Sequence, residues 1–269
     1  MRDGSEFPII NHPLDEPSVF TPDSLMDDVR RRRAIAGRSL PEVCLLEFDG
    51  ELTDWLVDRG LAKPLPSWAC FHTTMYSIEL GGRLCGIVPR TIGGPYAVLV
   101  AEQMAAAGVR LIIGLTSAGR LSPELPVPCL VVAAGAIRDE GTSYHYVPAG
   151  KYVRCPTSVV NSLERELHAV GWPVRCGDVW TTDAPYRETA SQLERWSSKG
   201  VLAVEMQAAS LFAFGAARNV AVGCVAVVSN AIDHDGPQFD TGAQEDGLRI
   251  IEACARAATA FFSTRCVLP

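Results

Sequence analysis

Short apolar runs alternate with alanine-rich stretches from residue 43 almost to the C-terminus, and this alternation constrains the fold more than any other feature of the chain. The runs have the length and composition of buried strands, and the strongest of them covers residues 220–228. Other strands are expected at 43–46, 84–88, 111–115 and 129–133. Helices are expected at 96–108, 205–217 and 247–262. Strands and helices in this succession predict layers packed into one α/β domain.

The first 42 residues differ from the rest. We expect residues 1–42 to form an arm and a helix, and residues 43–269 to form the main domain, because 269 residues suit one large core. Residues 1–20 carry prolines and few periodic apolar positions, which predicts an arm on the surface or on a neighbouring subunit. Thr21 and Pro22 are typical of a helix start, and the helix is expected to reach about Arg33. Its arginine run, 30–33, suits a phosphate contact less well than a solvated helix end.

Charge and cysteine content narrow the class of protein. A net charge of -7 provides no broad cationic field, so a nucleic-acid partner is not expected and a small ligand fits better. The nine cysteines contain no CxxC pair, and several lie inside apolar runs, which indicates reduced thiols in a cytoplasmic protein. The N-terminus has acids and prolines where a signal peptide has a basic start and an apolar run. We therefore expect neither secretion nor a membrane partner, because no apolar stretch reaches about 18 residues.

Two polar turns follow predicted strands. Gly93 and Gly94 lie between a strand and a helix, where glycines let a ligand approach bare backbone near a positive helix end. An ordinary strand-to-helix turn explains the same residues. Thr116, Ser117 and Ala118 stand at the carboxyl end of the next strand, which is where open α/β sheets place ligand contacts. The two turns are expected to face one crevice.

Three further segments carry candidate chemistry. His145 lies in an acidic and aromatic loop, 139–146, and is more typical of a structural hydrogen bond than of a catalyst. In the segment 181–188, Tyr186 stands between Asp183 and Glu188 and is suited to stack on a planar ring. The step from Glu205 to Gln207 opens a predicted helix and offers polar groups to sugar hydroxyls, although a capped helix start has the same pattern.

The irregular loop after the strongest strand contains two acids and a histidine, at 233–235. Such a group can suggest a metal ion. A metal site needs further ligands at suitable spacing, and the sequence has no third cluster of that kind. We therefore predict no metal ion at this loop.

Six segments taken in order resemble one enzyme family. They are residues 91–95, 114–121, 137–148, 181–188, 204–209 and 227–230. The family comprises uridine phosphorylases, hexamer-type purine nucleoside phosphorylases and methylthioadenosine or adenosylhomocysteine nucleosidases. The resemblance implies a three-layer α/β/α sandwich with a central mixed, partly barrel-like sheet, assembled as a homodimer or a trimer of dimers. It also implies cleavage of the N-glycosidic bond of a nucleoside, with no metal or cofactor.

The resemblance assigns roles on the sugar and base sides. Glu205, Met206 and Gln207 match the ribose-binding step, with Gln207 where a second acid usually stands. Whether natural or introduced, Gln207 can bond a ribose hydroxyl but cannot supply negative charge. The base-binding positions are matched by Tyr186, Pro185, Ala118 and Asn230. The catalytic candidates on the sugar and base sides are Gln207, Asn230 and Asp183.

Asn230 departs from the purine-cleaving relatives, which often place an aspartate there as the general acid. An asparagine suits a 6-oxopurine or another amide-like edge, but it is a poor proton donor. The identity of the base therefore stays open.

The nucleophile side departs most from the phosphorylases. Their glycine-aspartate-proline-x-arginine turn is replaced by residues 47–51, which contain three acids. A second family arginine falls near Gly114, and a third near 69–72, where no arginine stands. Arg90 and Arg120 are the candidate replacements.

The remaining candidates on the phosphate or water side are Thr116, Ser117, Gly93 and Gly94. A dianion beside acids without a fixed cation is unfavourable, so the sequence favours hydrolysis over phosphorolysis. Glu51, or Asp49 if the register shifts, is then the candidate base that activates water. Two other readings stay open: a nucleoside-binding sensor without turnover, and an enzyme of secondary metabolism that acts on a modified nucleoside.

Overall fold

The structure is a computed structural model that describes residues 8–231 and 243–265. Its strands are β1 Val43–Glu47, β2 Ala62–Pro64, β3 Tyr76–Leu80, β4 Arg83–Pro89, β5 Leu111–Arg120, β6 Cys129–Asp139, β7 Tyr152–Arg154, β8 Val174–Thr182, β9 Ala203–Glu205 and β10 Ala221–Ala231. Its α-helices are α1 Pro22–Arg33, α2 Glu51–Asp58, α3 Gly94–Ala106, α4 Thr157–Leu167, α5 Ala190–Ser197, α6 Ala208–Arg218 and α7 Gln244–Arg265. Short 3-10 turns are η1 Pro8–Ile10, η2 Thr142–His145, η3 His168–Val170 and η4 Pro185–Arg187.

The strands form one mixed sheet that closes on itself at one end. Its order is β10-β6-β8-β9-β5-β1-β4-β3-β2, with β7 paired to β6. Because β10 also pairs with β5, the strands β10, β6, β8, β9 and β5 form a closed ring, and β1 to β4 extend it as an open sheet. Parallel pairs such as β1–β5 and β10–β5 occur beside antiparallel pairs such as β10–β6. The prediction of a mixed, partly barrel-like sheet is confirmed.

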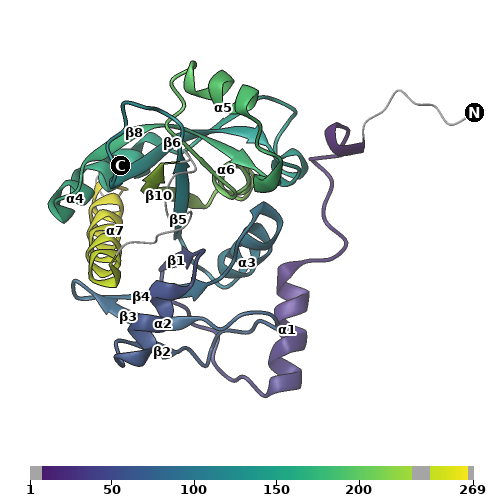
Figure 1. Cartoon of the computed structure of the whole chain (residues 1–269). Coiled ribbons are helices and arrows are strands. Elements are labelled where there is room, and N and C mark those ends of the chain that lie inside the picture. The colour runs from purple at the N-terminus through teal and green to yellow at the C-terminus, as the bar shows by residue number, and fades with distance from the viewer. Residues whose placement is uncertain (1–7, 232–242, 266–269) are drawn as a thin grey trace, which may run out of the picture.

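Helices cover the sheet on both sides, which gives the three predicted layers (Figure 1). On one side α4 packs against α7, and α7 also contacts α2. On the other side α3 contacts both α6 and α1. The main core lies between these layers and consists mostly of fully buried Val, Leu, Ile and Ala. The strands are apolar on both faces because helices cover both faces of the sheet, and this is why they appear in the sequence as continuous apolar runs.

The five predicted strands and the first helix lie where the sequence places them, but the helix expected from 205 begins later. Glu205 is the last residue of β9, and α6 starts at Ala208. The reason is local, because the Glu205 carboxylate accepts the backbone N–H groups of Gln207 and Ala208 and so caps the helix from outside it.

The N-terminal arm lies against its own chain in this structure. Its turn η1 contacts η2, and the ring centroids of His12 and His145 are 3.8 Å apart. The arginine run at the end of α1 is partly used in local contacts: Arg30 pairs with Asp27, and Arg33 Nη1 donates to the Cys70 carbonyl oxygen at 2.8 Å.

The eight described cysteines are free, and all except Cys176 are buried. In the part of the chain that the structure describes, no helix has both the length and the apolar character needed to cross a membrane.

Candidate active site

The loop after β1 places a carboxylate on the Ser117 donors. Asp49 Oδ2 accepts the Ser117 backbone N–H at 3.0 Å, and Asp49 Oδ1 accepts the Ser117 hydroxyl at 2.8 Å. Burial raises the pKa of Asp49 above its usual value, the two Ser117 bonds lower it, and the nearby Glu51 charge raises it. Both Ser117 donors, which the resemblance assigns to the phosphate or water side, therefore bind a carboxylate of this chain.

The neighbours of Asp49 hold this loop in place. Glu47 is buried and accepts the backbone N–H of Gly50 at 2.6 Å and both donors of Thr53, at 3.2 Å and 2.9 Å. The ring of Phe48 lies against Gly114, where an added Cβ would meet ring carbons at 3.0 Å and 3.1 Å. A long side chain at position 114 would collide with this ring, so the loop and the glycine fit as a pair.

The candidate replacement arginines lie on neighbouring elements. Arg90 pairs with Asp54 of α2, and its side chain lies over Gly50. Arg90 is about half exposed and adopts φ 60°, a left-handed conformation. Arg120 ends β5 and pairs in the sheet with Ala203 and Ala231.

The Gly93–Gly94 turn packs directly on α6. Gly93 adopts φ +89°, which favours glycine. Gly94 begins α3, and an added Cβ there would lie 2.1 Å from Ser210 Oγ. No other residue type fits at position 94 without moving α6, so this turn has a packing role as well as any ligand role.

The sugar side is built around the carboxylate of Glu205. Glu205 Oε2 accepts the backbone N–H of Gln207 at 2.6 Å and of Ala208 at 2.8 Å, and Oε1 accepts the Thr181 hydroxyl. Burial raises the pKa of Glu205 to about 7, against these bonds, which lower it. Glu205 thus fixes the turn that carries Met206 and Gln207.

Gln207 links the sugar side to the nucleophile side. It is buried, and its Oε1 lies 3.3 Å from the Thr116 hydroxyl and 3.2 Å from the Met206 backbone N–H, which donates to it. Thr116 adjoins Ser117, so one short path joins Asp49 to Gln207. Met206 is only partly buried.

The base side is less enclosed. Asp183 Oδ2 accepts the Gly141 backbone N–H at 2.8 Å, and burial raises its pKa above the usual value, with the charges of Glu140 and Asp139 adding to the rise. Tyr186 is 100% exposed, so its ring is open to solvent. Pro185, beside it, is partly buried. Asn230 pairs through its backbone with Gly119, while its side chain lies outside the described structure.

Hydrogen bonds connect several of the residues that the sequence singled out. The contacts run from Asp49 and Ser117 through Thr116 and Gln207. On the other flank of the sugar side, Glu205 bonds Thr181, whose neighbouring loop carries Asp183. Ala118 lies partly buried beside Ser117.

The sequence left Glu51 and Asp49 as alternatives for the base. Asp49 rather than Glu51 contacts Ser117, and Glu51 is an exposed residue at the start of α2. Sequence reasoning missed Thr181, whose hydroxyl binds Glu205 and accepts the Ala209 backbone N–H at 2.9 Å. Its position at the carboxyl end of a strand was the available signal, but that strand, β8, was not recognised.

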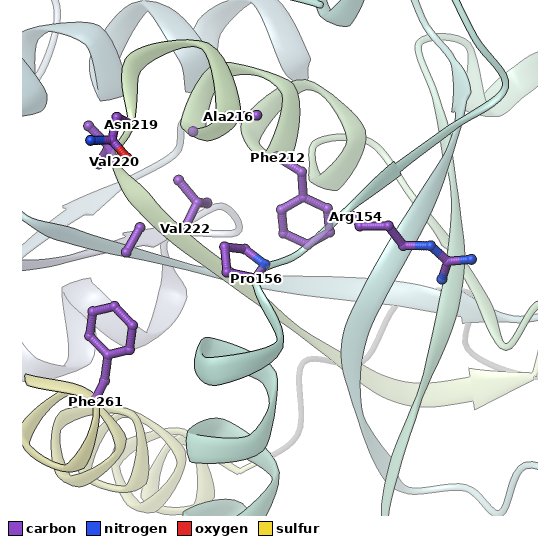
Figure 2. A pocket seen from close by; sticks show the side chains of 10 residues that line it. Arg154, Pro156, Phe212, Ala216, Asn219, Val220, Val222 and Phe261 are labelled. Atoms are coloured by element: carbon purple, nitrogen blue, oxygen red, sulfur yellow. The ribbon is translucent and has the colours of Figure 1, made fainter. Parts of the chain in front are cut away.

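A cavity of about 150 Å³ lies elsewhere (Figure 2). It is bordered by the second half of α6, the start of β10 and Phe261 of α7. On these elements the predicted site residues lie at the other end, with Gln207 directly before α6 and Asn230 near the end of β10. None of them lines the cavity, so it is separate from the candidate site.

Within the described residues, no group of three His, Cys, Asp or Glu side chains is placed to hold a metal ion. The acids and histidine at 233–235 lie outside those residues.

A known protein family matches most of this chain. The family model described as the phosphorylase superfamily matches residues 43–263. The chain belongs to the phosphorylase superfamily. Among its superfamily relatives, uridine phosphorylase of Salmonella typhimurium is 24% identical over 211 residues, covering 72% of this chain and 83% of the relative. Uridine phosphorylase of Escherichia coli is 24% identical over 215 residues, with the same coverage. Guanosine phosphorylase of Halorubrum lacusprofundi is 30% identical over 144 residues, covering 51% of this chain and 57% of the relative.

Proposed function

We propose that this protein cleaves the N-glycosidic bond of a nucleoside with water as the nucleophile. The observation that carries the proposal is the Asp49 carboxylate on both donors of Ser117. A phosphate dianion at this place would compete with a resident carboxylate and lie near a second buried acid, Glu47. A water molecule, in contrast, gains a base.

In the proposed reaction, a water oxygen bonds to the anomeric carbon as the bond from that carbon to the base nitrogen breaks. Asp49 takes a proton from the water, and the bonding electron pair leaves with the base. Gln207 and Met206 hold the ribose while positive charge develops on the sugar. Asp183, whose pKa is raised, is the proposed proton donor to the departing base, and Asn230 the proposed partner of its ring edge.

The first test is release of free base from a panel of purine and pyrimidine nucleosides, with and without phosphate. Release at equal rate without phosphate supports the proposal. Release that requires phosphate contradicts it and directs attention to Arg90 and Arg120.

Two alternatives have their own support. Phosphorolysis is favoured by the names of the relatives, which are uridine and guanosine phosphorylases. A nucleoside-binding sensor is favoured by Gln207, which lacks the charge of an acid. Binding of a nucleoside without cleavage across the panel would support the sensor.

We further propose that the protein acts in the cytoplasm on a small-molecule nucleoside and assembles as a homodimer or a trimer of dimers. Size-exclusion chromatography with light scattering tests the assembly, and a monomer would exclude it.

A further inference from the structure

A buried carboxylate outside the predicted site joins three of the segments that form it. Glu140 follows β6 and is 7% exposed. Its Oε2 accepts the Ser143 backbone N–H at 2.9 Å and the Ser210 hydroxyl at 2.6 Å. Its Oε1 is buried and has no hydrogen-bond partner among the described residues. A buried carboxylate oxygen without a hydrogen-bond partner costs free energy, so the presence of Glu140 here needs an explanation.

The bond to Ser210 reaches the sugar side. Ser210 is fully buried in the first turn of α6, which begins directly after Met206 and Gln207. The direction and position of this turn decide where Gln207 lies. The same serine hydroxyl lies 2.1 Å from the place of a Cβ on Gly94, so the start of α3 also rests on this contact.

The backbone next to Glu140 reaches the base side. The N–H of Gly141, the following residue, donates to Asp183 Oδ2. A shift of Glu140 would therefore move the partner of Asp183 and the start of α6 together.

The η2 loop itself does not depend on Glu140 alone. Arg138 Nε donates to Ser143 Oγ at 2.7 Å, and its Nη1 donates to the Pro148 carbonyl oxygen at 2.7 Å. Loss of the bond from Glu140 to Ser210 should thus leave the loop folded and loosen only its connection to α6.

We infer that Glu140 is a positioning residue. Through Ser210 it fixes the η2 loop, the start of α6 and the Gly94 turn relative to one another. The inference rests on the proposed nucleoside site but not on the choice of nucleophile. A nucleoside would contact both the base side, next to the η2 loop, and the sugar side, at the start of α6. A free base would contact only the base side.

Ser210→Ala tests this inference, with Ser162→Ala as the matched control. Ser162 is also a buried helical serine, and its hydroxyl bonds the Ser158 carbonyl oxygen within α4. We expect Ser210→Ala to raise KM for the cleaved nucleoside about tenfold, since small misplacements weaken oriented contacts strongly. Inhibition by the free base should change less than twofold. An unchanged KM, or an equal loss for nucleoside and base, would overturn the inference.

Glu140→Gln gives a second readout that a purely structural role would not change. The glutamine keeps an oxygen for both serine donors but removes the charge. Because the Glu140 charge contributes to the raised pKa values of Asp183 and Glu205, its removal lowers both. We expect the alkaline limb of the kcat/KM profile, which follows loss of the proton from Asp183, to move to lower pH, with KM at the optimum within twofold of the original. An unmoved profile would contradict the inference.

If the protein binds nucleosides without cleaving them, the dissociation constants for nucleoside and base are measured in place of KM and the inhibition constant. The same tenfold and twofold changes are then expected for Ser210→Ala. If no nucleoside binds, the proposed function fails, and amide hydrogen exchange still tests Glu140. Faster exchange at 141–143 and 207–210 in Ser210→Ala, absent from Ser162→Ala, supports the link. Unchanged exchange in both segments overturns it.

Discussion

At the residue scale, Asp49 and Gln207 define what the candidate site can do. Asp49 fills both donors of Ser117, and Gln207 replaces a charge with an amide whose oxygen lies near Thr116 and Met206. Their residue types could be read from the sequence. Their contacts could not, because the register that chooses Asp49 over Glu51 depends on how Glu47 caps the following loop.

Asp49→Asn should lower kcat/KM by about 10²-fold to 10⁴-fold, the range for loss of a general base. The amide keeps one acceptor for Ser117, so the thermal midpoint should stay close to that of the original protein. Steady-state kinetics and thermal unfolding check both parts. Activity within twofold of the original would show that Asp49 is not the base.

Gln207→Glu should raise kcat/KM several-fold, because a charged acceptor forms hydrogen bonds about twice as strong as a neutral one and opposes the positive charge on the sugar. The donors near Gln207 Oε1 suit a carboxylate equally well. The measurement is kcat/KM for the best nucleoside of the panel. A fall in activity would indicate that the amide is required at this position.

At the element scale, the sequence pattern predicts helix α6 but not the residue at which it begins. An alanine-rich run predicts the helix, but the exact start depends on Glu205, which ends β9 and caps α6 from the strand. Strand β8 was missed because its first half alternates buried and exposed residues weakly, with Arg175 and Cys176 both exposed. Its second half, which carries Thr181, is buried by the barrel and not by any local pattern.

The burial of Glu205 also predicts how stability depends on pH. The pKa of Glu205 is raised from 4.5 to about 7, so its contribution to stability is complete below pH 4.5 and is lost as pH rises through 7. The shift corresponds to about 3 kcal/mol of unfolding free energy. Glu205→Gln should therefore flatten the fall in stability between pH 5 and pH 8. Urea unfolding at both values tests this, and an equal fall in both proteins would refute it.

At the scale of the whole molecule, the barrel explains why distant segments form one site. Strand β10 closes the ring onto β5, and β8 and β9 complete it between β6 and β5. The resemblance to a known family predicted this closure. The apolar runs alone predicted only layers, since long-range strand pairing leaves no local mark in the sequence. The base side could be predicted least, because the Asn230 side chain lies outside the described residues and Tyr186 is fully exposed.

The sugar product formed in the presence of saturating phosphate tests the choice of nucleophile most directly. Chromatography with mass detection separates the free sugar from the sugar 1-phosphate after incubation with the best nucleoside of the panel. With Asp49 on the Ser117 donors, we predict free sugar as the product even when phosphate is abundant. Sugar 1-phosphate as the main product would contradict hydrolysis and show that phosphate displaces Asp49.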